Sequence, residues 1–342
     1  MSVMTASTPA AGRQGAGGPR LSRWLVRLHR PALLVWAGLV VLGAGLLLWL
    51  AGPLTDAAAE AWRRWSSCAE RPTCRYDQKP LLLFNVTYTY LTLSMAALPF
   101  LVAAWAGAAL VGREMESGTA QLTWTQGVTP ARLAAKPALP AAAVTTGTGL
   151  LVFLHRRAWS AAHGRVGSLD NWYMTWAFHT NGATLVAFGI AGLAAGAFAG
   201  VVLRRTLPAL GGALVLTAGV LGLAQWLMPH LWPAVTRVTG FQQGYGDLYN
   251  GIEVDHGLLT ASGGHIPEPG CTAGTSEECR RLYRKLGGVG YYNTYHPASH
   301  YWPLQLTTTA LVLALTALLT AGAFLVLRRL TGAFRLAKAA TS

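Results

Sequence analysis

The stretch that best defines this chain reads GREMESGTAQLTWTQGVTPARLAAK, from Gly112 to Lys136. Two long apolar runs, residues 83–111 and 137–154, lie on either side of it. A run of about 20 apolar residues can cross a bilayer as a helix, whereas an irregular polar loop does not lie among lipid chains. The stretch therefore predicts a loop outside the membrane that joins two spanning helices.

The composition of the whole chain favours a membrane protein. Of 342 residues, 52% are hydrophobic and 12% are charged, whereas about 25% of residues are charged in a typical soluble domain. Six runs are long and apolar enough to span a bilayer: residues 32–51, 83–111, 137–154, 183–203, 208–228 and 304–327. The first of them exceeds the apolar region of about 7–15 residues in a cleaved signal peptide. We therefore predict an all-α, polytopic protein of the cell membrane with six transmembrane helices.

Charges beside the spans predict the orientation. Basic residues gather before residue 31, in 112–136, at 204–205 and in the tail 328–342. Of the 13 acidic residues, only Glu114 and Glu116 lie in these four segments. Basic residues near span ends favour the cytoplasmic side, so both termini and the 112–136 loop are expected there. The loops 52–82 and 155–182 and the segment 229–303 are then external. No basic and aromatic nucleic-acid module is visible, so the net charge of +14 is interpreted as facing the membrane.

The parts outside the spans have distinct compositions. Residues 1–19 are rich in Gly, Ala, Ser and Thr and are expected to be a disordered tail. Residues 20–31 place Arg20, Arg23, Arg27 and Arg30 opposite leucines and a tryptophan, which predicts an interfacial amphipathic helix that Pro31 separates from the first span. The alternative is a basic flank that only anchors this span. The segment 229–303 is expected to form a small external cap with short helices, for instance near residues 277–286.

All four cysteines, Cys68, Cys74, Cys271 and Cys279, lie in predicted external loops. An even number on the oxidising side suggests two disulfides, and local pairing of Cys68 with Cys74 and of Cys271 with Cys279 is favoured among three possible pairings. A metal site is disfavoured because neither pair has C-x-x-C spacing. His296 and His300 have a spacing that suits a metal on a helix, but Pro297 lies between them.

The spans contain no Asp, Glu, Lys or Arg, which disfavours an ion-coupled carrier. A possible substrate path is a polar face at the start of the second span, formed by Asn85, Tyr88, Thr89 and Thr92. The alternative for its threonines is a bond to the carbonyl one turn earlier in their own helix. Gly192, Gly196 and Gly200 recur every four residues and permit close helix packing. No lysine is preceded by glycine, so the chain lacks a P-loop and we expect no enzyme activity or bound cofactor of its own.

These residues also carry a resemblance to a known family. The pattern Arg113-Glu114-x-Glu116-x-Gly118-Thr119, followed by Leu122, Arg132 and Lys136, resembles the first cytoplasmic loop of ABC-2 type transporter permeases, the membrane subunits of ATP-binding cassette transporters. Trp124-Thr125-Gln126 is similar to an element of the subgroup common in actinobacteria. Residues 28–34 and the two cysteines of the first external loop are similar as well, and so are residues 295–299 with Trp302 and Gln305 before the last span. The chain departs from the pattern at 307–309, where three threonines stand in place of an acidic residue.

The resemblance implies a permease that pairs with a second permease copy and with separate cytoplasmic ATPase subunits, which bind ATP and Mg. It implies that the 112–136 loop, with Arg113, Glu114, Glu116, Gly118, Thr119, Leu122, Trp124, Arg132 and Lys136, couples to the ATPase. Export is the expected direction. The alternative function is a membrane-embedded sensor or resistance protein that kept the fold without transport.

Overall fold

The structure is a computed structural model in which residues 18–68, 76–118, 137–167, 171–244, 250–271 and 275–340 are described. For 18–25, residue 28 and 331–340, only the backbone is described. The expected tail 1–19 therefore lies almost wholly outside the described residues.

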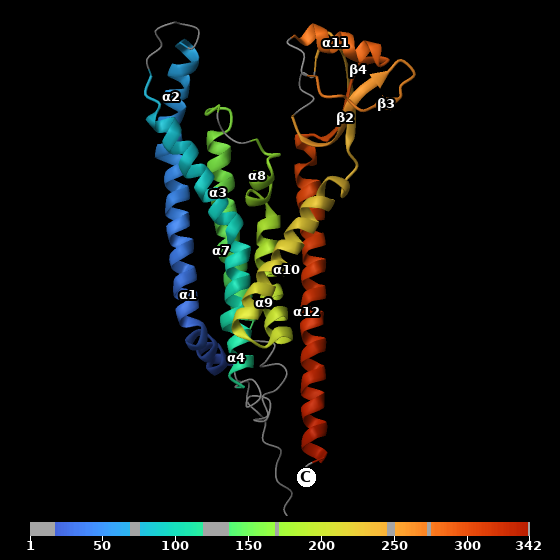
Figure 1. Ribbon diagram of the computed structural model, residues 1–342. Coiled ribbons are helices and arrows are strands. Elements are labelled where there is room, and N and C mark those ends of the chain that lie inside the picture. The colour runs from blue at the N-terminus through green and yellow to red at the C-terminus, as the bar shows by residue number, and fades with distance from the viewer. Residues whose placement is uncertain are drawn as a thin grey trace, which may run out of the picture.

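Six helices in this part of the chain are long and apolar enough to cross a membrane, which confirms the predicted all-α polytopic fold. They stand side by side in one bundle (Figure 1). The candidate spans are His29–Cys68, Lys79–Glu116, Ala138–Ala162, Ala183–Leu203, Thr206–His230 and Ala298–Leu330. A helix can pair its backbone groups within itself, which is the condition for crossing a hydrocarbon core.

The first span is longer than its apolar run. It comprises helix α1 (Gly18–Trp49), a π-helical turn η1 (Leu50–Leu54) and α2 (Thr55–Cys68). Pro31 lies inside α1 rather than before it, and the first turns of α1 run at an angle to the rest (Figure 1). Pro53 lacks a backbone donor and is accommodated in the π-turn without ending the helix. Residues 52–68 and 79–82 of the segment expected as an external loop, 52–82, are therefore helical, and Ala58, Ala59 and Ala61 of α2 are buried in the bundle.

The second span also changes its helical form near one end. Helix α3 (Lys79–Trp105) passes into the π-helix η2 (Ala106–Gly112) and then into α4 (Arg113–Glu116). Helices α7 (Ala138–Ala162), α8 (Thr175–Thr180), α9 (Ala183–Leu203), α10 (Thr206–Leu227) and α12 (Tyr301–Ala340) follow. Helix α9 is the centre of the bundle, since it packs on α3, η2, α7, α10 and α12.

The segment before α12 is folded, but it is built on a sheet that the sequence analysis did not predict. Its four strands are β1 (Val235–Gly240), β2 (Ile252–Thr260), β3 (His265–Ile266) and β4 (Gly288–His296), antiparallel in the order β1-β4-β2-β3. The short helix expected near 277–286 is present as α11 (Ser276–Lys285). The side chains of Phe241, Leu258, Tyr283 and Tyr291 form a core between α11 and the sheet.

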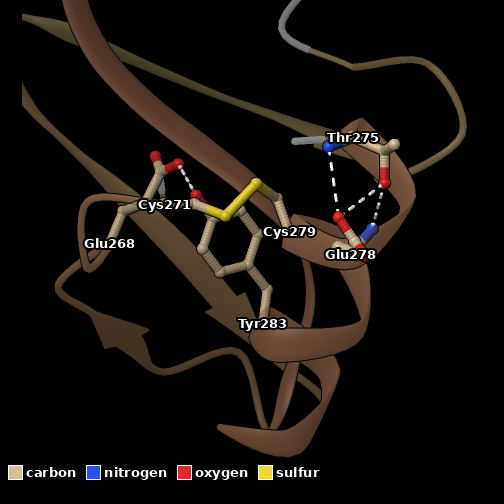
Figure 2. The surroundings of a disulfide bond; sticks show 6 residues. All are labelled: Glu268, Cys271, Thr275, Glu278, Cys279 and Tyr283. Carbon is tan, nitrogen blue, oxygen red and sulfur yellow. Dashed lines mark hydrogen bonds between the residues drawn. A yellow bond between two sulfur atoms is a disulfide. The ribbon is translucent and has the colours of Figure 1, made fainter. Parts of the chain in front are cut away.

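The disulfide of this segment joins Cys271 to Cys279 in α11, as the sequence analysis favoured (Figure 2). Thr275 precedes α11 and forms a capping box with Glu278. The Thr275 hydroxyl accepts from the backbone N–H of Glu278, and the Glu278 carboxylate accepts from the backbone N–H of Thr275. The Tyr283 hydroxyl donates to Glu268 at 2.7 Å. Cys68 is disulfide-bonded as well, whereas Cys74 lies outside the described residues.

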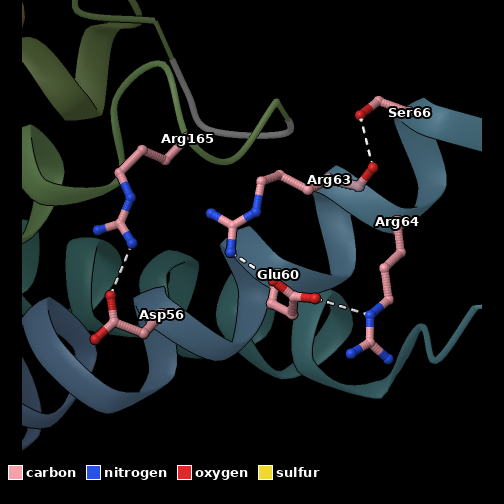
Figure 3. Close-up of polar contacts among 6 residues, drawn as sticks. All are labelled: Asp56, Glu60, Arg63, Arg64, Ser66 and Arg165. Atoms are coloured by element: carbon pink, nitrogen blue, oxygen red, sulfur yellow. Dashed lines mark hydrogen bonds and ion pairs between the residues drawn. The ribbon is translucent and has the colours of Figure 1, made fainter.

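Polar contacts on α2 lie at the surface (Figure 3). Glu60 pairs with Arg63 and Arg64 in its own helix, and Asp56 pairs with Arg165 after α7 at 2.8 Å. Exposed pairs of this kind contribute little, about 0–1 kcal/mol. The position of α2 therefore depends on its buried alanines rather than on these ions.

The two ends of the bundle differ. Helix α4, the first turns of α1 and the C-terminus lie at one end, here named the loop end, and the sheet and α2 lie at the opposite one, the sheet end (Figure 1). Helix α4 and the sheet lie at opposite ends because three candidate spans, Ala138–Ala162, Ala183–Leu203 and Thr206–His230, connect them.

Candidate functional site

The described start of the expected coupling loop is fixed to the bundle by Glu116. Its carboxylate accepts two hydrogen bonds from Thr206, one from the backbone N–H at 2.9 Å and one from the hydroxyl. Thr206 is the first residue of α10, and the first N–H groups of a helix lack partners within it. Glu116 therefore caps α10 from another element and joins the end of the second span to the start of the fifth.

The same region is joined to α9 and α10 by backbone contact. A Cβ built on Gly196 of α9 would lie 2.5 Å from the Ala103 carbonyl oxygen and 2.7 Å from the Gly107 nitrogen, and one on Gly107 would lie 2.8 Å from the Ala209 carbonyl oxygen of α10. Side chains do not fit at such distances. The glycine seam of Gly192, Gly196 and Gly200 thus lets α3 and η2 lie directly on α9.

The remaining residues of the expected coupling loop are only partly described. Arg113 is exposed, Glu114 is half-buried, and Gly118 has a φ of 71°, a left-handed conformation that favours glycine and turns the chain after α4. Thr119, Leu122, Trp124, Arg132 and Lys136 lie outside the described residues. The connection between α9 and α10 is short, with Arg204 and Arg205 alone between the two helices.

The expected substrate path is divided between the interior and the surface. Tyr88 and Thr92 are buried, Asn85 is half-buried and Thr89 is exposed. The hydroxyl of Thr92 does not bond to its own helix but lies 2.9 Å from His155 Nε2 of α7, and the Tyr88 ring stacks on the same imidazole with centroids 5.2 Å apart. The two buried members of the path therefore converge on one histidine.

His155 opens a chain of buried polar contacts between helices. Its Nδ1 lies 2.8 Å from Asn181 Oδ1, and because an amide oxygen only accepts, Nδ1 donates and Nε2 accepts from Thr92 when the ring is neutral. The Asn181 carbonyl accepts from the Tyr301 hydroxyl at 2.7 Å and from Arg156 at 3.3 Å. The Arg156 guanidinium lies over the rings of Tyr301 and Trp302, each at 4.9 Å.

A second set of contacts holds the break between α8 and α9. Gln305 of α12 is fully buried; its Nε2 donates to the Phe178 carbonyl at 2.6 Å and its Oε1 accepts from the Thr184 amide at 3.2 Å. His179 bonds to the Thr184 hydroxyl and, at 2.7 Å, to Gln225 of α10. Four helices thus meet at the interrupted backbone near Asn181.

His155 and Asn181 were not predicted as site residues, and Gln305 was noted only for its place in the family resemblance, not for this buried contact. The sequence analysis ended the third span at residue 154 and assigned 155–182 to a loop, whereas α7 continues to Ala162. A histidine directly after an apolar run and a glutamine inside one were the available signals, but their partners are distant in sequence. Thr206 as the partner of Glu116 was missed for the same reason.

The described residues offer no metal site, since none of their His, Cys, Asp and Glu groups forms a cluster of three or more. His296 Nδ1 lies 3.1 Å from His300 Nδ1, and its Nε2 donates to the Pro229 carbonyl at 2.9 Å. Burial lowers the pKa of His296, which favours this neutral, hydrogen-bonded state. His296 and His300 therefore form a hydrogen bond with each other.

Comparison with known proteins agrees with this arrangement. The family model described as ABC-2 membrane transporter related matches residues 23–229, which include the first five candidate spans and end just before β1. Neither the curated proteins nor the solved structures contain a match. Because the matched residues make up more than half of the chain, the chain belongs to the ABC-2 membrane transporter related family and is an ABC-2 type permease, a membrane component of a transporter.

Proposed function

We propose that this permease exports its substrate with energy from a separate cytoplasmic ATPase, which docks on the 112–136 loop. A second permease copy completes the membrane part, and ATP and Mg bind to the ATPase. The observation that carries the proposal is the bond of Glu116 to Thr206. It makes the first described turn of the loop continuous with α10, so a displacement of the loop is passed to the bundle.

The close packing of η2 supports the same role. Gly107 of η2 lies against the Ala209 carbonyl of α10, and Gly196 of α9 lies against the Gly107 amide, so η2 packs at backbone distance on both helices and a movement of η2 is passed to them. The π-helical form of η2 is also typical of segments with a functional role rather than of plain structural helices. The loop between α9 and α10 is too short to dock another protein.

The side of the membrane can be tested with three exposed serines, each changed to cysteine. We expect Ser117→Cys at the loop end to be protected from an impermeant thiol reagent in intact cells, and Ser66→Cys and Ser262→Cys at the sheet end to react. The physical reason is the excess of basic residues beside the loop end. Ser117→Cys should react once the membrane is opened, and its labelling in intact cells would contradict the proposed orientation.

Energy coupling can be tested by truncating the expected apolar anchor of the loop. We expect Trp124→Ala to leave membrane insertion intact and to weaken association with the ATPase, because truncating a true interface anchor costs about 1–3 kcal/mol. The measurement is the amount of ATPase that copurifies with the chain from native membranes in mild detergent. Trp226→Ala, at an exposed tryptophan on α10, is the matched control and should change nothing.

Glu116→Gln distinguishes binding of the ATPase from the coupling of ATP hydrolysis to the membrane helices. The amide keeps the size of the side chain but lacks the negative charge that favours the start of α10. We expect unchanged copurification together with a smaller effect of the permease on ATP hydrolysis by the bound ATPase. Unchanged copurification and hydrolysis in Trp124→Ala, Glu116→Gln and the double change of Glu114 and Glu116 to alanine would exclude this loop as the coupling element. If no ATPase copurifies with the unchanged chain, the sensor function becomes the better account.

A further inference from the structure

Four exposed tryptophans lie where helices of the bundle reach the sheet end, and they are here named the tryptophan belt. Trp49 ends α1, Trp176 lies in α8, Trp226 lies in the last turn of α10 and Trp302 in the first turn of α12. They are exposed by 40%, 46%, 69% and 51% respectively. An indole has a large apolar ring and one N–H donor, so an exposed indole is best accommodated in the headgroup layer, between hydrocarbon and water.

Charged residues begin directly beyond the level of this belt. In the first candidate span, no charged residue lies between residues 31 and 55, and Asp56 opens the charged helix α2 seven positions after Trp49. In α7, the uncharged run 137–155 ends at Arg156. Charged side chains are costly in hydrocarbon. The hydrocarbon core therefore ends before Asp56 and at about the level of Arg156.

The distance from the belt to the charges of the loop end matches one bilayer. At the rise of an α-helix, residues 30–49 correspond to about 29 Å, residues 205–226 to about 32 Å and residues 138–156 to about 27 Å. A hydrocarbon core is about 30 Å thick. Residues 302–328 correspond to about 39 Å, which tilt of α12 and the long side chain of the arginine at its far end accommodate. Three helices thus give the same thickness, with the belt at one boundary.

The belt is joined to the bundle at Trp302. The Arg156 guanidinium of α7 lies 4.9 Å from the centroid of the Trp302 ring and donates to the Asn181 carbonyl at the break between α8 and α9. A guanidinium beside an exposed indole is suited to the level of the lipid phosphates, where the cation stays hydrated and the ring stays partly in hydrocarbon. Arg156 therefore fixes α7, α12 and the α8–α9 break at one level.

We infer that the tryptophan belt binds the phospholipid headgroups of one leaflet and thereby sets the depth of the bundle in the bilayer. The first span then ends near Trp49 and not at Cys68, and α2 and the sheet stand in water. The polar contacts around His155 lie at the level of the same headgroups, because His155 directly precedes Arg156. The inference holds for either orientation of the chain and does not depend on the proposed ATPase coupling.

The depth can be measured with the full-length chain in vesicles of phosphatidylcholine and phosphatidylglycerol. A nitroxide label is attached to one introduced cysteine at a time, and its collisions with oxygen, which concentrates in hydrocarbon, are compared with those of a water-soluble nickel chelate. Two exposed positions on α1 and α2 enclose Trp49: we expect Leu46→Cys to collide more with oxygen and Ala57→Cys more with the nickel chelate. Leu306→Cys and Ser299→Cys, which enclose Trp302, should differ in the same way.

A second measurement tests whether the indoles set this depth. Leucine prefers hydrocarbon to the headgroup layer, so Trp49→Leu with Trp176→Leu should move the sheet end deeper and reduce the nickel collisions of the labels at Ala57 and Ser299. The matched control replaces the same two residues with tyrosine, which also prefers the headgroup layer, and should keep the original collisions.

Three results would overturn the inference. The first is an order of collisions opposite to the expected one at either pair of labels. The second is an unchanged depth in the leucine variant. The third is a label at Leu46 or Leu306 that is shielded from both oxygen and the nickel chelate, because protein rather than lipid would then cover the helix beside the belt.

Discussion

Replacing Gly196 with alanine should destabilise the bundle by about 1–3 kcal/mol, the usual cost of overpacking a close-packed site. The new Cβ would lie 2.5 Å from the Ala103 carbonyl oxygen and 2.6 Å from the Ala106 Cβ, so α9 must move away from α3 and η2. The measurement is the midpoint of thermal unfolding of the purified chain in detergent. The change should also weaken coupling, because it separates the elements that the loop moves.

Gly219→Ala is the matched control for this prediction. Gly219 lies on α10 with no atom within 4 Å of a Cβ built on it. Alanine is a better helix former than glycine by about 0.5–1 kcal/mol, so this change should raise the midpoint or leave it unchanged. The two substitutions are chemically identical and should act in opposite directions. An unchanged or raised midpoint for Gly196→Ala would contradict the packing of α9 described above.

Replacing Gln305 with leucine should have an even larger effect. The change removes the donor to the Phe178 carbonyl and the acceptor of the Thr184 amide, both in the buried interior. Each unpaired buried group costs about 1–3 kcal/mol, and the gap between α8 and α9 offers no helix neighbour to replace the lost bonds. We expect a strongly lowered unfolding midpoint and increased proteolysis near residue 181.

Two further variants test the role of Gln305. Thr320→Val lies in the same helix, and the Thr320 hydroxyl donates to the Thr316 carbonyl one turn earlier in that helix, so we expect the change to be tolerated. Gly182→Ala should act like Gln305→Leu, because its Cβ would lie 2.2 Å from the Gln305 side chain and displace the amide. Normal stability of both Gln305→Leu and Gly182→Ala would show that the amide bridge does not hold the α8–α9 junction.

The sequence alone determined the class of fold. Runs of apolar residues without charges, such as 183–203 and 304–327, have few alternatives to membrane-spanning helices, because hydrocarbon provides no hydrogen-bond partners for a backbone of any other form. Charge near the spans predicts which end faces the cytoplasm, and this orientation stays a prediction. Local signals also placed α11 and the pairing of Cys271 with Cys279, since both depend on residues close together in the chain.

Only the tertiary structure decided which polar residues meet. Thr92, His155 and Asn181 come from three separate segments, and Glu116 reaches Thr206 across 90 positions. The continuation of the first span through Pro53 and the sheet before α12 were likewise not evident, because buried alanines of α2 and strand pairing between residues far apart stabilise them. Span formation is a local balance between each residue and lipid, whereas the site depends on contacts between helices that no local pattern specifies.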